Sequence, residues 1–169
     1  MLSRVAGQPL GEFVRARVFE PLAMTATLYR PGEDRRPRIA PTEADAWRGR
    51  VVHGEVHVEN AFALGGIAPH AGLFSTAGDL ARFVQMLLNG GVLEHHRLVS
   101  RGTVELFTRR AGGVLDPTRA LGWGPKSPEH STGGAFFPPG SLGYTGFTGT
   151  STWVGSVRDR LVLLLRPRA

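Results

Sequence analysis

The sequence contains no cysteine, which excludes disulfide bonds and thiolate metal sites. Long apolar runs are also missing: the longest unbroken one, Leu161 to Leu165, suits a buried strand, whereas a span across a bilayer needs about 20 residues. The first seven residues lack the apolar core of a signal peptide. These absences leave the cellular compartment open and predict no membrane span in this chain.

Lysine is nearly absent as well, because only one of the 20 basic residues is a lysine, Lys126. The net charge is +6, carried by arginines spread along the chain, with short clusters at Arg35–Arg38 and Arg109–Arg110. No basic helix or aromatic-basic stripe gathers them. We therefore interpret the excess charge as solvated surface and expect no nucleic-acid partner. The hydrophobic share of 41% is ordinary for a globular domain, and 169 residues can enclose one core.

The first third of the chain predicts helices followed by a long loop. A helix is expected over residues 9–20, with Pro9 at its first position and Pro21 ending it. Residues 2–6 resemble the last turn of another helix. Residues 25–60 are rich in proline and glycine and are expected to be mostly loop, with a tryptophan, Trp47, as the anchor that packs it down.

Two more helices follow. The helix over residues 77–89 has a start signature in Thr76 and Asp79, and Asn89-Gly90-Gly91 is a strong stop. Ser75 and Thr76 are better explained as caps of this helix than as nucleophiles. Ser100 is expected to cap a shorter helix through Arg109, with two apolar side chains facing inward, Val104 and Phe107.

The last third predicts strands. Leu121–Gly124 could form a short strand, and Gly133–Gly140 a loop rich in glycine and proline. Tyr144–Val154 and Leu161–Arg166 are expected to pair as antiparallel strands, joined by a turn through residues 155–159. Helices first and a hairpin last indicate the α+β class.

The segment from Leu142 to Ser151 carries the strongest chemical signal. Gly146 and Gly149 have no side chains, so a substrate could lie close to the backbone, and Thr145 adds a hydroxyl. On its spacing alone, the segment could equally be an exposed strand rich in threonine and glycine.

Tyr144-Thr145-Gly146 resembles the K/H-T-G motif of the serine β-lactamase and penicillin-binding-protein family, in the branch of class C β-lactamases, D-alanyl-D-alanine carboxypeptidases and esterases. Other segments resemble the same family, in the same order, and together cover nearly the whole chain: Phe19–Met24, Val56–Gly66, Ala71–Thr76 with Asp79-Leu80, and Trp153-Val154.

The resemblance implies an incomplete β-lactamase/transpeptidase-like fold: a helical region plus part of an antiparallel sheet, in a single partial domain over residues 1–169 that is truncated at its N-terminus and also at its C-terminus. It implies acyl-serine hydrolysis of a small lactam, D-amino peptide or ester, with no metal or organic cofactor. The residues expected to bind substrate are Tyr144, Thr145, Gly146 and Phe147, the last through a backbone N–H in the oxyanion hole. Tyrosine departs from the family here, because a neutral phenol at pH 7 offers only a hydrogen bond where lysine or histidine is usual.

The nucleophile and base of the family are missing. No serine has a lysine three positions later, and neither Tyr29 nor Tyr144 begins a Y-x-N or Y-x-S triplet. We expect no catalytic residue in this chain; the nucleophilic serine, lysine and tyrosine would lie upstream, in a complementary N-terminal half, so that the chain is inactive alone. The alternative is a non-catalytic module that keeps the cleft to bind ligands, so whether the chain is an enzyme stays open.

The histidines offer a weak metal signal. His53 and His57 have a spacing that binds zinc on a helix, with Glu55 and Glu59 beside them, but the region is expected to be loop and Gly54 disfavours a helix. We predict no metal site here.

Overall fold

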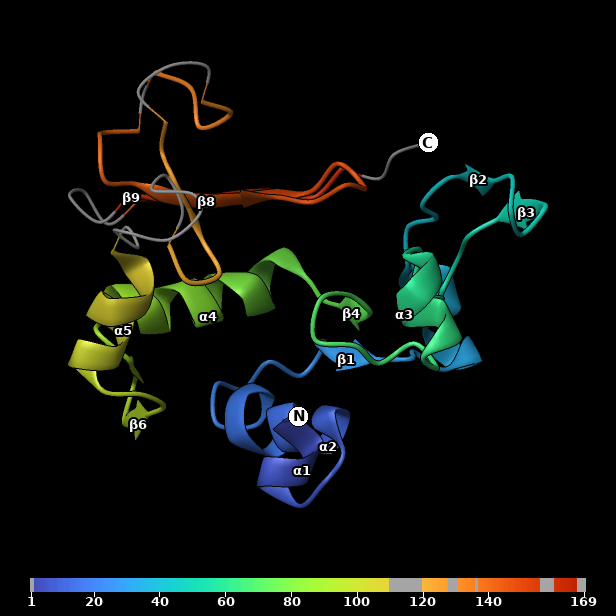
Figure 1. Ribbon diagram of the computed structural model, residues 1–169, viewed down its shortest axis with the longest axis horizontal. Coiled ribbons are helices and arrows are strands. Elements are labelled where there is room, and N and C mark those ends of the chain that lie inside the picture. Colours follow the sequence, from blue (N-terminus) through green and yellow to red (C-terminus); the bar gives the residue numbers. More distant parts are fainter. Residues whose placement is uncertain (1, 110–119, 128–130, 136, 156–159, 167–169) are drawn as a thin grey trace. The chain divides into compact units, whose positions relative to one another are not determined.

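The computed structural model describes residues 2–109, 120–127, 131–135, 137–155 and 160–166 (Figure 1). Contacts divide these residues into two compact units, one reaching to Leu80 and the other running from Ala81 to Arg166. The expectation of one partial domain over residues 1–169 stays a prediction.

The first unit begins with two short helices, α1 (Leu2–Ala6) and α2 (Leu10–Val14). Gly7 separates them with a φ of +67°, a value that suits glycine at a helix end. The predicted helix over residues 9–20 is confirmed, with one correction: after α2 it continues as a π-helix, η1 (Arg15–Phe19). The Glu20 N–H donates to the Arg15 carbonyl five residues earlier, at 3.0 Å.

The predicted loop over residues 25–60 contains several very short elements. Strand β1 (Leu28–Tyr29) pairs antiparallel with β4 (Leu73–Phe74), and β2 (Ala44–Asp45) pairs with β3 (Arg50–Val51). A 3-10 helix, η2 (Glu33–Arg38), and an α-helix, α3 (Glu59–Ala63), complete it. The small core beside α3 consists of Val56, Ala61 and Ala68.

The prediction that Trp47 anchors this loop is wrong, because its side chain is 60% exposed. The next residue, Arg48, does so instead, with a side chain only 4% exposed. Its guanidinium pairs with Asp45 and donates to the carbonyls of Val56 at 3.1 Å and His57 at 3.0 Å. Since buried charge is tolerated only when it is paired and hydrogen-bonded, these partners explain how an arginine can replace an aromatic anchor.

Helix α4 (Ala77–Leu88) confirms the predicted helix over residues 77–89. The Asp79 N–H donates to Thr76 Oγ1 at 3.3 Å, as the start signature predicts. The Asp79 carboxylate instead accepts bonds from the Ala26 N–H at 2.9 Å and from Thr27 Oγ1 at 2.7 Å. It therefore ties the helix start to residues 26–27. Gly91, at φ +93°, closes the other end by donating to the Met86 carbonyl.

After a small hairpin of β5 (Val92–Leu93) and β6 (His96–Arg97), helix α5 (Arg101–Thr108) confirms the predicted helix after Ser100. The Ser100 hydroxyl accepts a bond from the Thr103 N–H at 3.0 Å. Val104 is half-buried, but the expectation that Phe107 faces inward is wrong, since 47% of it is exposed.

The second unit contains a four-stranded antiparallel sheet in the order β10-β9-β8-β7. Its strands are β7 (Gly124–Pro125), β8 (Leu142–Thr145), β9 (Ser151–Gly155) and β10 (Arg160–Leu164). Figure 1 shows this sheet nearly edge-on, with α5 beside one of its faces.

Two strand predictions need correction. The predicted strand Tyr144–Val154 is two strands, because the chain turns between Gly146 and Thr150, with Gly149 at φ +91°. Of the predicted strand Leu121–Gly124, only Gly124 lies in a strand, β7, because Gly122 has a φ of +84°. The described part of the Gly133–Gly140 loop is confirmed. Of the predicted turn through residues 155–159, Gly155 lies in β9, and residues 156–159 lie outside the described residues.

Trp153 on β9 is the centre of packing on one face of the sheet, and only 8% of it is exposed. Its cross-strand partner is Gly143, where an added Cβ would lie 2.5 Å from the indole ring. Gly133 approaches the same ring, and Phe137 packs against it with ring centroids 6.0 Å apart. The two glycines therefore leave the room that the indole occupies.

Candidate functional site

The four candidate substrate-binding residues lie at the end of β8 and in the turn that follows. Tyr144 pairs with Thr152, and Thr145 pairs with Ser151. Tyr144 is 56% exposed and Phe147 is 70% exposed, and Thr145 is exposed as well. The structure therefore brings the four predicted residues together at one accessible end of the sheet.

The turn is fixed by backbone bonds and by Thr150, a residue that the sequence analysis did not single out. The Gly146 N–H donates to the Thr150 carbonyl at 2.7 Å, and the Gly149 N–H donates to the Gly146 carbonyl at 3.1 Å. A Cβ added at Gly146 would lie 2.6 Å from Thr150 Oγ1. A side chain at position 146 would therefore displace Thr150, so the packing of the turn favours glycine here, besides any close approach of a substrate. The spacing G-x-x-G-T is the signal that could have indicated this.

Tyr144 and Thr145 point to opposite faces of the sheet, because successive side chains alternate along a strand. Tyr144 shares its face with Leu142, whereas Thr145 shares the face of Gly143 and Trp153. A ligand lying on one face could not contact both side chains. What they share is the edge of β8.

That edge is open beyond Gly143. Strand β7 pairs with β8 only at Leu142 and Gly143, and no other strand of the described residues pairs with β8 on that side. The Ser141 carbonyl accepts the Lys126 N–H on the β7 side, at 2.7 Å. Because backbone groups alternate in direction along a strand, those of Thr145 point to the same side, where β7 has ended. Thr145 thus presents a donor and an acceptor to the open edge.

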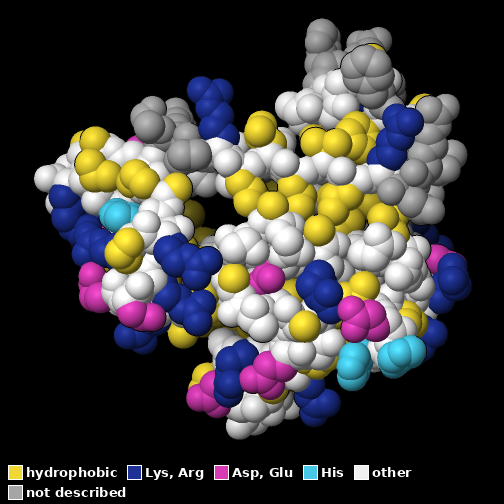
Figure 2. Space-filling view, turned by 180° about the vertical axis from the view of Figure 1, so that it is seen from behind, with side chains coloured by type: hydrophobic (Ala, Val, Ile, Leu, Met, Phe, Trp, Pro, Cys, Tyr) yellow, Lys and Arg dark blue, Asp and Glu magenta, His cyan; other side chains and the backbone are white. Residues whose placement is uncertain are grey.

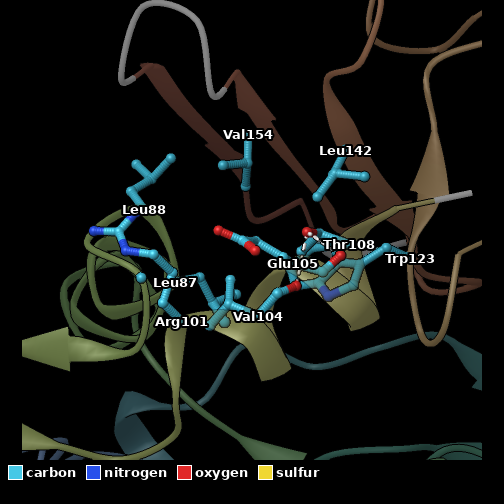
Figure 3. A pocket seen from close by; sticks show the side chains of 10 residues that line it. Leu87, Leu88, Arg101, Val104, Glu105, Thr108, Trp123, Leu142 and Val154 are labelled. Atoms are coloured by element: carbon cyan, nitrogen blue, oxygen red, sulfur yellow. Dashed lines mark hydrogen bonds between the residues drawn. The ribbon is translucent and has the colours of Figure 1, made fainter.

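A separate hollow, with a volume of about 180 Å³, lies between α5 and the face of the sheet that carries Leu142 and Val154 (Figure 3). Its lining includes Leu88 and Val104 from the helices, Trp123, and Leu142 and Val154 from the sheet. Arg101 and Glu105 add charge to an otherwise apolar surface. None of the four candidate residues lines it, so it is distinct from the open edge.

The histidines that raised the question of a metal have other partners. His57 Nε2 lies 2.7 Å from Glu43 Oε1, and His53 Nε2 lies within 3.0 Å of the backbone carbonyls of Arg36 and Ile39. Within the described ranges, no group of three or more histidine and carboxylate side chains is placed to hold a metal ion. A search of the same residues for a helix long and apolar enough to cross a membrane also found none.

Basic side chains occur in several separate groups on the face shown in Figure 2, with acidic side chains among them. Several of these arginines pair with carboxylates on the surface, for example Arg82 with Glu94 at 2.9 Å. This distribution fits the interpretation of the excess positive charge as solvated surface.

Comparison with known proteins identifies relatives over almost the whole chain. The family model described as Beta-lactamase matches residues 1–165. The chain is 35% identical to a "Putative D-alanyl-D-alanine carboxypeptidase" of Escherichia coli O157:H7, over 98% of this chain and 41% of that protein. A protein of the same description from Salmonella gallinarum is 33% identical, over 99% and 42%. The chain thus spans less than half the length of these curated relatives.

Solved structures show the same fold at low sequence identity. Simvastatin synthase (LovD) from Aspergillus terreus superposes with a TM-score of 0.65 at 16% identity, covering 98% of this chain and 46% of that one. A beta-lactamase from Mycobacterium bovis gives a TM-score of 0.62 at 20% identity, covering 99% and 52%. A penicillin-binding protein homolog from Caulobacter crescentus gives 0.61 at 17% identity, covering 99% and 50%.

These matches confirm the α+β, β-lactamase/transpeptidase-like fold and its partial extent. They also agree with the resemblance that runs from Phe19–Met24 to Trp153-Val154, because the family model covers both segments. The chain belongs to the beta-lactamase family.

Proposed function

We propose that this chain supplies the substrate-binding strand of a β-lactamase-related serine hydrolase that acts on a small acyl compound. The observation that carries this proposal is the open edge of β8, where Thr145 turns its backbone donor and acceptor away from β9. An extended acyl group could pair with this edge as an added strand.

The turn after β8 would hold the reacting carbonyl. The N–H of Phe147 would donate to the oxygen on which negative charge develops during acyl transfer. Loss of one such donor costs about 10²–10³-fold in rate where it has been measured. Gly146, locked onto Thr150, would keep that part of the backbone in a fixed position.

Tyr144 would select the substrate class. It lies beside the open edge and is exposed, but it brings a neutral hydroxyl where the family's motif has a cation or an imidazole. It would therefore add no charge attraction to a substrate carboxylate. The candidate substrates are a lactam, a D-amino peptide and a carboxylic ester, and the last needs no such carboxylate.

The chain by itself would be inactive, since its sequence has no S-x-x-K and no Y-x-N. The serine, lysine and tyrosine would come from a complementary N-terminal half, which makes that half the expected protein partner. We expect no labelling of the purified chain by a fluorophosphonate or a fluorescent penicillin, whereas the full-length E. coli relative should be labelled. Stoichiometric labelling of any serine in this chain would refute the assignment.

The role of the edge can be tested in a chimera that joins the N-terminal part of the E. coli relative to this chain. We expect the chimera to be acylated by the fluorophosphonate, and Thr145→Pro to slow acylation at least about tenfold, because proline removes the edge donor. Proline is tolerated where an N–H faces an open edge, so circular dichroism should show that the fold is kept. Thr132→Val, an exposed threonine in a turn, is the matched control. Equal rates for Thr145→Pro and the control would contradict the proposal.

The alternative is a binding module without catalysis, and the retained open edge in a chain without S-x-x-K favours it. It predicts that the purified chain alone binds an acylated amino acid, weakened by Thr145→Pro, in the absence of any labelling. A chimera that folds but is never acylated would support this alternative over the hydrolase.

A further inference from the structure

The hollow beside α5 is a feature of the second unit that the proposed function does not use. In Figure 3, Leu142 on β8 and Val154 on β9 point from the sheet toward Val104 on α5. Leu88, at the end of α4, and Trp123, just before β7, also line it. All of the lining residues belong to this unit. The hollow therefore has walls on opposite sides within one compact unit, unlike the bare face of a sheet.

The size of the hollow limits what it can hold. Its volume is about 180 Å³. An apolar cavity of about 150 Å³ in another protein is large enough to bind benzene. This hollow therefore has room for one ring or for a branched chain of similar size. Trp123, at one end in Figure 3, offers an aromatic surface against which such a group can pack.

Two opposite charges also line the hollow. Arg101 and Glu105 are exposed and lie one turn apart on α5, yet within the described residues neither forms an ion pair or a side-chain hydrogen bond. The Arg101 guanidinium lies against Gly90, where an added Cβ would be 2.9 Å from its Cζ. In Figure 3 the guanidinium lies at the end away from Trp123, and the Glu105 carboxylate lies between them. The order along the hollow is thus a cation, an anion and an apolar end.

This order disfavours the simpler occupants. A hydrocarbon would use neither charge. An organic anion would be attracted by Arg101 but would bring its negative charge close to Glu105, and an amine would be attracted by Glu105 but repelled by Arg101. At similar distances the attraction and the repulsion have similar magnitudes, so they largely cancel. A molecule that carries both signs of charge at one end and an apolar group at the other complements the whole lining.

We propose that the hollow binds a free apolar amino acid with a side chain of the size of leucine or phenylalanine. Its carboxylate would pair with Arg101 and its ammonium with Glu105, through charge-assisted hydrogen bonds. Its side chain would fill the space between Val104, Leu142 and Trp123. The inference does not rest on the proposed function, because none of the four candidate substrate-binding residues lines the hollow and binding there needs no nucleophile.

The test titrates the full 169-residue chain with phenylalanine and with two analogues that each lack one charge. Isothermal titration calorimetry measures both enantiomers, and the tighter one is compared with 3-phenylpropionate, which has no ammonium, and 2-phenylethylamine, which has no carboxylate. Phenylalanine should bind at least about tenfold more tightly than either analogue, since each loses one pairing and keeps one repulsion. Its binding should weaken as salt is raised.

Methyl signals in nuclear magnetic resonance spectra locate the bound molecule. Those of Leu142 and Val154, on the sheet wall of the hollow, should shift as phenylalanine is added. The methyl signals of Val51, which is 52% exposed in the other unit, should not shift.

Variants decide whether the charges on α5 select the ligand. Glu105→Gln should weaken binding of phenylalanine about fivefold and strengthen binding of 3-phenylpropionate, because the charge that repels its carboxylate is gone. That gain of binding is a result that misfolding could not produce. Arg101→Gln should likewise weaken phenylalanine and strengthen 2-phenylethylamine. The matched control is Glu12→Gln, the same change at an exposed glutamate of α2 in the first unit, which should alter neither ligand.

Three results would overturn the proposal: no saturable binding of either enantiomer, equal binding of phenylalanine and 3-phenylpropionate, or equal effects of Glu105→Gln and Glu12→Gln. The second result, together with shifts at Val154, would make the hollow an apolar cavity without selection for an amino acid. Shifts at Val51 without shifts at Val154 would place the bound molecule elsewhere.

Discussion

The loop of residues 42–57 in the first unit and the turn between β8 and β9 in the second hold their shapes by opposite means. The loop is organised around a side chain, Arg48, which is 4% exposed and pairs with Asp45. The turn and the two strands that it joins are organised by missing side chains: Gly146 leaves room for Thr150 in the turn, and Gly143 on β8 leaves room for Trp153 on β9. One region depends on a buried charge, and the other depends on close backbone approach.

The difference indicates how each region tolerates change. A buried ion pair fails when either partner is removed, because the remaining charge has lost both water and its partner. A glycine contact fails when anything is added, since a packed interior has little free volume. We therefore expect the first region to be sensitive to truncation and charge, and the second to be sensitive to single methyl groups.

The largest effect is expected from Arg48→Met. Methionine keeps an unbranched apolar side chain but leaves Asp45 unpaired and removes the donor to the Val56 and His57 carbonyls. Removing one partner of a buried pair typically costs about 3–5 kcal/mol. Urea unfolding, followed by hydrogen exchange of the amides between residues 42 and 63, would measure this loss.

The matched control is Arg50→Met, two residues away. Arg50 pairs with Glu55, but its side chain is 50% exposed, so solvent already screens the pair and the loss should be much smaller. If Arg48→Met destabilises this loop no more than Arg50→Met does, the loop does not depend on its buried charge.

Local signals allowed the sequence to predict most helices. The Ser100 hydroxyl caps α5, and the glycines after Asn89 end α4, as expected from their immediate neighbours. The anchor of the long loop could not be predicted in this way. Burial of Arg48 requires carbonyls eight and nine residues further along the chain, and aromatic residues are the more usual anchors.

The candidate site shows the same limit. Thr145, Phe147 and Thr148 favour extended structure, so the sequence predicts one strand from Tyr144 to Val154. The contact between Gly146 and Thr150 breaks that strand into two. The sequence could not predict that the pairing of β8 with β7 stops at Gly143, because this pairing joins Gly143 to Gly124 across an intervening loop. Tyr144 and Thr145 end β8 and lie on opposite faces, and Gly146 and Phe147 lie in the turn that follows, whereas the sequence predicts all four within one strand. Their role in substrate binding stays a prediction.

A smaller effect is expected from Gly143→Ala in the second unit. The added Cβ would lie 2.5 Å from the Trp153 ring, so the indole must move or the strands must separate. Overpacking of this kind typically costs about 1–3 kcal/mol. Near-ultraviolet circular dichroism should report the displaced indole, and urea unfolding should give the free energy. Gly124→Ala is the matched control on the neighbouring strand, because its Cβ would meet only the Gly143 carbonyl, at 3.3 Å. Equal losses for the two variants would show that room for the indole is not what Gly143 provides.

The smallest effect concerns acid and separates the two bonds that Arg48 donates to the Asp45 carboxylate. The backbone N–H of Arg48 is the largest cause that lowers the pKa of Asp45 below its ordinary value, and the guanidinium of Arg48 adds to it. Because the pKa is lower in the folded state, Asp45 stabilises the loop above the pKa of the unfolded chain, and this contribution is lost as the pH falls through the folded pKa. Stability of the wild-type loop should therefore decline below about pH 4.

Hydrogen exchange of the same amides between pH 7 and pH 2 would resolve that decline in three proteins. It should be weaker in Asp45→Asn, whose amide does not titrate, than in the wild type. In Arg48→Met it should persist in reduced form, because the backbone N–H of residue 48 is still present when the guanidinium is gone. A decline of the same size in the wild type and in Asp45→Asn would mean that the acid sensitivity of this loop arises from another carboxylate, and the buried pair would then explain its stability at neutral pH but not its loss in acid.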